Sequence, residues 1–172
     1  VFDVYVCEKP GVKLLDTKTK DGIHIVIGIR VSRKVQYLLR QKVLKNIGNV
    51  LEDLPLINGF EDVLDEGIAK GRTNWQLYGS CKPGHDRYEL VYHYKFTIDK
   101  EDDLEWDEQP IDLSRTLQWL PLISARTTEI PLFPVKEHVQ IEVEQEQTKK
   151  KVTKKYVVKC EDLDVMHIDS VE

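Results

Sequence analysis

The sequence predicts an α+β fold built on a mostly antiparallel sheet, with helices packed on one face and a ligand on the other. Residues 23–29, 74–80 and 88–96 alternate with the period of two that places successive strand side chains on opposite faces. Residues 35–47 instead repeat their apolar side chains at the three- and four-residue spacing of an amphipathic helix. The chain has 172 residues, 41% of them hydrophobic, which is enough for one domain with its own core.

The N-terminal part is expected to form two strands joined by a polar loop. Residues 2–7 are largely apolar and are followed by turn residues, so the first strand should end there. In the second strand, residues 23–29, four isoleucines share one face and indicate a core, while His24 lies on the other face. A single histidine in an apolar strand is usually structural, but its small neighbours Val26 and Gly28 leave room for a ligand.

A helix should follow, with Ser32 as its N-cap and with a basic face that is either solvated or in contact with DNA. A turn signal then leads to a short apolar strand that ends at Asp65. After a flexible basic link, residues 74–80 are expected to form a strand with Trp75 and Leu77 on one face. The polar face of that strand would consist of Asn74, Gln76, Tyr78 and Ser80, with Lys82 just beyond.

Residues 88–96 carry aromatic side chains at alternate positions, and residues 99–107 form an acidic link. The aromatic stripe either belongs to the core of the sheet or stacks on nucleic-acid bases. A short helix is expected at residues 113–125, interrupted by Pro121. Residues 135–143 then alternate in the manner of an edge strand, before a highly charged segment that predicts an exposed hairpin tip or linker at residues 145–155.

The composition limits the possible functions. The net charge of −5 argues against nucleic-acid binding, yet the first 100 residues hold 16 basic and 13 acidic side chains, so that half remains suited to phosphate. No apolar run approaches the length of a membrane helix, and no signal peptide opens the chain. The three widely spaced cysteines indicate reduced thiols, and Cys81, His85 and His93 lack the spacing of a zinc site.

Three motifs, in this order, resemble the archaeo-eukaryotic primase superfamily. They are Gly22-Ile23-His24-Ile25, Val63-Leu64-Asp65 and Asn74-Trp75-Gln76-Leu77-Tyr78-Gly79-Ser80-Cys81-Lys82. The resemblance covers residues 1–96 and is closest to the primase domain of the primase-helicases of nucleocytoplasmic large DNA viruses, with the PrimPol enzymes more distant. It implies an RNA-recognition-motif-like sheet and a partial catalytic core in residues 1–143, followed by a charged hairpin or linker and a C-terminal extension in residues 144–172.

The resemblance also implies roles for individual residues. Asp65 corresponds to a metal-binding acid, so Mg²⁺ or Mn²⁺ is the implied cofactor. His24 corresponds to the catalytic, phosphate-binding histidine of a Ser-x-His pattern in which Gly22 replaces the serine. Four more residues fall at nucleotide-binding positions, namely Lys20, Gln76, Ser80 and Lys82, although PrimPol carries an arginine where Gln76 stands. From the residues alone, Asp65 would equally be a strand-end or turn aspartate, and Lys20 a solvated loop lysine.

The implied function is template-directed primer synthesis by a DNA primase, a nucleotidyltransferase within a viral primase-helicase. Nucleoside triphosphates, a single-stranded DNA template and a helicase domain of the same full-length chain are the implied partners, at a viral replication site in the host cytoplasm or nucleus. The family's upstream acid pair is not in the sequence, so we expect it before Val1 and expect the fragment alone to be inactive. The alternative is a non-catalytic nucleic-acid-binding module, while a metal-dependent nuclease would need more acids than these motifs supply.

Overall fold

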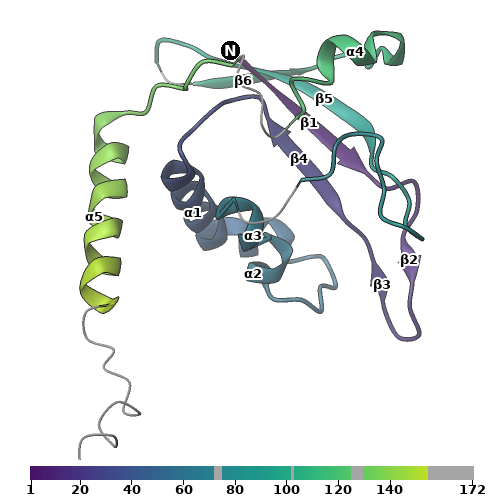
Figure 1. Cartoon of the computed structure of the whole chain (residues 1–172), viewed down its shortest axis with the longest axis horizontal. Helices are drawn as coiled ribbons and strands as arrows, with labels where there is room; N and C mark the ends of the chain where they lie inside the picture. The colour runs from purple at the N-terminus through teal and green to yellow at the C-terminus, as the bar shows by residue number, and fades with distance from the viewer. Residues whose placement is uncertain (72–74, 102, 125–129, 155–172) are drawn as a thin grey trace, which may run out of the picture. The chain divides into compact units, whose positions relative to one another are not determined.

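The structure, a computed structural model, describes residues 1–71, 75–101, 103–124 and 130–154 (Figure 1). The chain forms two compact units, residues 1–133 and 134–172. The first unit is α+β, as predicted, and its four-stranded antiparallel sheet has the order β4-β1-β5-β6. These strands are β1 (Phe2–Glu8), β4 (Ile23–Ile27), β5 (Glu89–Ile98) and β6 (Leu104–Glu108). No helix in the described ranges combines the length and the apolar character needed to cross a membrane.

The remaining elements of the first unit are short apart from one helix. The expected polar loop contains a small hairpin of β2 (Lys13–Leu14) and β3 (Thr19–Lys20). Helix α1 (Arg33–Leu51) is followed by single turns α2 (Phe60–Val63) and α3 (Glu66–Ala69). The 3-10 turn η1 (Leu113–Arg115) continues into α4 (Thr116–Trp119), which ends before Pro121, as predicted.

Strand β1 lies in the middle of the sheet and determines which side chains share a face. Cys7 lies opposite His24 of β4 and opposite Leu90 of β5, so these three residues point to the same side. Tyr5, two residues earlier, lies opposite Val26 and His93 on that same side. We call this side the covered face.

The covered face carries the described core of the unit. Tyr5, Cys7 and Leu90 are buried together with Ile123, and side chains from the loop before β5 and from residues 111–122 pack around them. Burial, followed by the nearby charge of Asp3, raises the pKa of Tyr5 to about 12. The Tyr5 ring stacks on His93, whose Nε2 lies 2.8 Å from Oδ1 of Asp3.

The opposite side, which we call the open face, is apolar but largely uncovered. It carries Ile23, Ile25 and Ile27, which are 55%, 57% and 40% exposed. In the register these isoleucines lie across from Val4 and Val6 of β1, and the aromatic stripe of β5 continues the same face. The prediction that the isoleucine face forms the core is therefore wrong within the described residues, because the core lies on the face that carries His24. Ligand binding by His24 stays a prediction.

Helix α1 contains the predicted residues 35–47, extends beyond them at both ends, and has the predicted cap, Ser32. The Oγ atom of Ser32 accepts a hydrogen bond from the backbone N–H of Val35, which satisfies one free donor of the first turn. Leu38 and Ile47 are its buried side chains. Its closest packing partners are the turns α2 and α3, so the three helices form one group (Figure 1).

Two strands expected in the motif region are wrong. Asp65 does not end a strand but caps α3, because its carboxylate accepts a hydrogen bond from the N–H of Gly67. Residues 75–80 form a loop with a tight turn, in which Gly79 takes a φ of +80° and Ser80 donates its N–H to the carbonyl of Leu77. Asn74, the first residue of that predicted strand, lies outside the described residues.

Two C-terminal predictions are also wrong. The expected acidic link contains β6, which pairs with β5 through a tight turn. The expected edge strand and hairpin tip are instead helix α5 (Glu137–Lys154), in which Val139 and Val143 keep the four-residue spacing of a helix face. The Glu, Gln and Lys residues of this segment are good helix formers. The strand prediction failed because it used the alternation of a few residues and not the helix propensity of the whole segment.

Because the backbone at Gly28 lies close to β1, we predict that a single methyl group added at residue 28 destabilises the fold. Its N–H donates to the carbonyl of Asp3 at 2.7 Å, and a Cβ at residue 28 would lie 2.9 Å from that backbone oxygen. Gly28→Ala should therefore lower the free energy of unfolding by about 1–3 kcal/mol. Gly11→Ala is the matched control, since no atom lies within 4 Å of its Cβ. Equal urea midpoints for the two variants would contradict the described register.

Candidate nucleotide site

His24 lies against two aromatic side chains of the segment that precedes β5. Its ring stacks on Tyr88, with centroids 3.6 Å apart and planes 16° apart. The Trp75 ring is tilted against it at 4.5 Å. These contacts leave His24 half-buried and bring the motif histidine and the motif tryptophan together, although residues 75–80 form a loop and not the predicted strand.

A lysine adds positive charge to this cluster. The Nζ atom of Lys9 lies 5.3 Å from the centroid of the Tyr88 ring, at a cation–π distance. Burial, and secondarily the charge of Lys9, lowers the pKa of His24 below its ordinary value. A neutral imidazole beside an ammonium group can donate one N–H to an anion while the lysine supplies the charge.

The loop from Trp75 to Tyr88 is anchored at several points. The hydroxyl of Tyr78 accepts a hydrogen bond from the N–H of Leu90 at 3.3 Å, and its ring packs against the core. The Ser80 hydroxyl donates to the carbonyl of Leu77 at 2.6 Å. Gln76 is partly buried, whereas Ser80 and Lys82 are exposed. These hydrogen bonds therefore hold the loop in place, while the Lys82 side chain is exposed to solvent.

The predicted basic ligands, Lys20 and Lys82, are not among the described residues whose side chains contact the His24 ring. Lys20 is exposed on β3, and Lys82 is exposed in the loop after the tight turn. Neither forms an ion pair or a cation–π contact with another described residue. Neither Tyr88, which stacks on His24, nor Lys9, which lies over the Tyr88 ring, was predicted as a site residue. In the sequence, the one indication that another residue lies close to the start of β4 was Gly22, because a glycine next to a strand often marks the close approach of another group.

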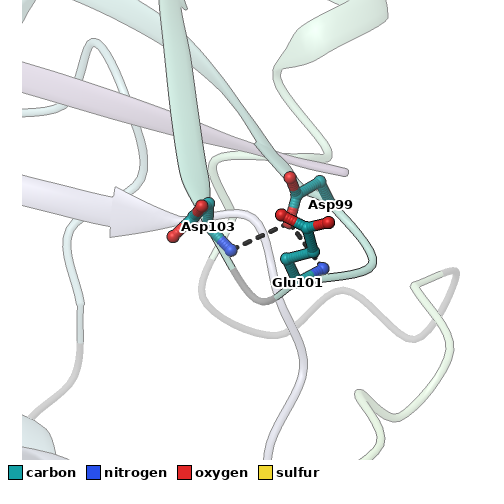
Figure 2. A group of neighbouring side chains, drawn as sticks. All are labelled: Asp99, Glu101 and Asp103. Atoms are coloured by element: carbon teal, nitrogen blue, oxygen red, sulfur yellow. Dashed lines mark hydrogen bonds between the residues drawn. The ribbon is translucent and has the colours of Figure 1, made fainter.

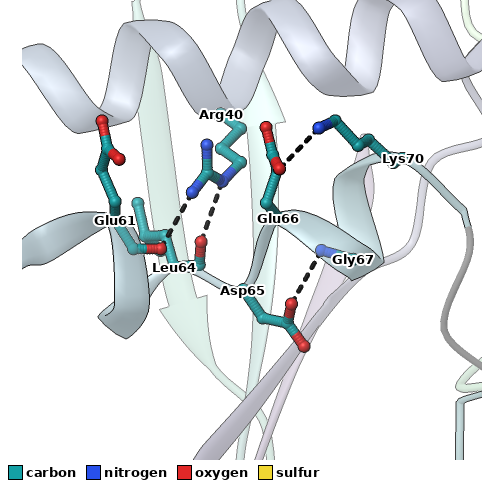
Figure 3. A network of polar contacts seen from close by, with 7 residues as sticks. All are labelled: Arg40, Glu61, Leu64, Asp65, Glu66, Gly67 and Lys70. Atoms are coloured by element: carbon teal, nitrogen blue, oxygen red, sulfur yellow. Dashed lines mark hydrogen bonds and ion pairs between the residues drawn. The ribbon is translucent and has the colours of Figure 1, made fainter.

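Asp65 is held by helix α1 through the backbone of its neighbours (Figure 3). The Arg40 guanidinium donates from Nε to the carbonyl of Leu64 at 2.8 Å and from Nη2 to the carbonyl of Glu61 at 2.9 Å. The Asp65 side chain is exposed and turns away from α1 toward the N–H of Gly67. Its carboxylate is thus held in one orientation and exposed to solvent.

A metal site is not complete around Asp65 in the described part of the chain. Three acids whose oxygens could meet at one ion, Asp99, Glu101 and Asp103, lie instead in the turn between β5 and β6 (Figure 2). There Oδ1 of Asp99 accepts the N–H groups of Glu101 and Asp103, which explains the cluster as a hairpin turn. Two-metal chemistry needs more carboxylates than Asp65 alone.

The lowered pKa of His24 predicts a specific pH dependence of stability. The unfolded chain binds the proton at the ordinary pKa of 6.5, above the pKa in the folded state, so acidification through this window favours unfolding. We expect the free energy of unfolding of the wild type to fall more steeply between about pH 7.5 and about pH 5 than that of His24→Gln. Urea denaturation in matched buffers measures both slopes. Parallel slopes would mean that His24 is solvated.

Comparisons with known proteins agree with the placement of the motifs. Residues 1–94 match the family model described as "C962R protein N-terminal AEP domain", where AEP denotes archaeo-eukaryotic primase. A protein of Acanthamoeba polyphaga mimivirus that is named as a candidate helicase (L207/L206) is 32% identical over 103 residues, which cover 58% of this chain and 11% of that protein. No solved structure matches the chain. Since the match includes β1, β4, the Asp65 turn and the His24 cluster, the chain belongs to the archaeo-eukaryotic primase family of viral primase-helicases.

Proposed function

We propose that this chain is the part of a DNA primase that binds the incoming nucleoside triphosphate during primer synthesis. The observation that carries the proposal is the cluster of His24, Lys9 and Tyr88 at the end of the sheet, since it offers an imidazole N–H and an ammonium group to phosphate oxygens. Lys20 and Lys82 are exposed and would contribute their ammonium groups to the same triphosphate, and Ser80 would contribute its hydroxyl after release from the carbonyl of Leu77. Gln76 would contribute a neutral hydrogen bond only.

Asp65 would supply one oxygen ligand to Mg²⁺ or Mn²⁺, and the remaining carboxylates would come from a segment outside this sequence. The metal, when bound, would neutralise charge on the triphosphate. Within this chain, Arg40 keeps the Asp65 turn in place, and the bond from Gly67 fixes the orientation of the carboxylate. A single-stranded DNA template, a helicase domain and a viral replication site in the host complete the proposal.

A non-catalytic nucleic-acid-binding module is the second candidate, and the open face supports it. Tyr92 of β5 and Trp106 of β6 are 42% and 58% exposed there, and such rings can stack on bases. The same face carries Glu8 and Glu108 among its cross-strand partners, which disfavours a phosphate backbone nearby. We therefore prefer the nucleotide-binding function.

The decisive variant is Asp65→Asn in the full-length polypeptide that contains this chain. An amide keeps the shape and the bond from Gly67 but loses the charge that holds a divalent cation, so metal-dependent primer synthesis should fall by at least about a hundredfold. Asp62→Asn, an exposed acid of α2, is the matched control and should retain activity. Synthesis at the wild-type rate by Asp65→Asn would exclude Asp65 as a ligand. Intact DNA binding without synthesis in the wild type would favour the second candidate.

A further inference from the structure

Tyr88 touches two residues at the start of β4 at once. Its ring stacks on His24, and its hydroxyl occupies the space beside the α-carbon of Gly22. A Cβ placed on Gly22 would lie 2.6 Å from the Tyr88 hydroxyl oxygen and 3.6 Å from the ring carbon that bears it. The first distance is not compatible with a side chain at residue 22, whereas the second is an ordinary contact. Only the hydroxyl therefore requires glycine at this position.

In this contact the backbone of Gly22 is held more firmly than the side chain of Tyr88. The backbone of Gly22 continues directly into β4, which pairs with β1 from Ile23 onward. Tyr88 immediately precedes β5, and the next residues of that strand pair with β1. The ring is also under the ammonium group of Lys9. A methyl group at residue 22 would accordingly displace the ring from His24 rather than shift the backbone.

The stacked ring limits the orientations of the imidazole. A histidine side chain has two rotatable bonds, and a planar partner at 3.6 Å with a 16° interplanar angle leaves few combinations of them free of clashes. Trp75 restricts the same ring from a second direction of approach, at 4.5 Å and 42°. The imidazole nitrogen atoms therefore have a restricted orientation before a ligand binds, which reduces the conformational entropy lost on binding.

We propose that Tyr88 is a positioning residue for nucleotide binding: its ring orients His24 toward the phosphates, and the absence of a side chain at Gly22 admits the tyrosine. The inference rests on the proposed function, because it takes His24 as a phosphate contact. Tyr88 itself acts through His24. The proposed role predicts how substitutions at residues 22 and 88 combine, since the clash with a side chain at residue 22 comes from one oxygen atom of Tyr88.

The test uses four variants of the 172-residue chain and ATP with Mg²⁺ as the probe. Tyr88→Leu removes the stacked ring and should weaken ATP binding about threefold to tenfold. Gly22→Ala should do the same by pushing the ring away. Tyr88→Phe keeps the ring and should bind within about twofold of the wild type. The double variant Gly22→Ala/Tyr88→Phe should recover the affinity that Gly22→Ala loses, because the clashing oxygen is gone.

A second measurement separates positioning from general damage. The ring protons of His24 lie under the Tyr88 ring, so their NMR signals should lie further upfield in the wild type, in Tyr88→Phe and in the double variant than in Tyr88→Leu or Gly22→Ala, where only Trp75 remains beside the imidazole. Unchanged His24 signals in Tyr88→Leu, or a Gly22→Ala effect that Tyr88→Phe does not relieve, would overturn the inference alone. If the wild-type chain does not bind ATP, the proposed function fails and the role of Tyr88 in binding fails with it, whatever the ring signals show.

Discussion

The pairing of β1 with both β4 and β5 is the constraint on which the candidate site depends. It places Cys7 opposite His24 on one side and opposite Leu90 on the other, so the histidine and the start of β5 lie on the same face. Tyr88, two residues before Leu90, then falls directly on the imidazole. A slip of one residue between β1 and β4 would turn His24 to the open face and separate it from this partner.

Asp65 depends on a different part of the unit. Helix α1 fixes the Asp65 turn through Arg40, and Gln36 adds a contact to the carbonyl of Ile68. The sheet residue His24 and the helix-supported Asp65 are therefore held by separate groups of contacts, which the chain joins through the segment between β4 and Ser32.

The sequence predicted the elements whose patterns are long and local. The strands at β1, β4 and β5 and the Ser32-capped helix follow from periodicity and capping, and the family follows from three ordered motifs. The sequence could not show which face of the sheet is covered, because alternation of side chains distinguishes the two faces but does not indicate which of them other elements pack against. The predicted strand at residues 74–80 is a loop with Gly79 at a positive φ, which a two-residue alternation does not exclude. Asp65 was placed in a strand because a run as short as Val63-Leu64 has no period of its own. Lys9 and Tyr88 were not predicted as site residues because the contacts from Tyr88 to His24 and from Lys9 to Tyr88 join segments far apart in the chain.

The most direct test of this account is an NMR study of the histidine rings during titration with ATP and Mg²⁺. The sequence contains five histidines, so each ring can be assigned and followed separately. The account predicts nuclear Overhauser contacts from the His24 ring to both Trp75 and Tyr88 in the free chain, and the largest ATP-dependent shifts at His24. Absence of both ring contacts, or ATP-dependent shifts at the other histidines with none at His24, would contradict it.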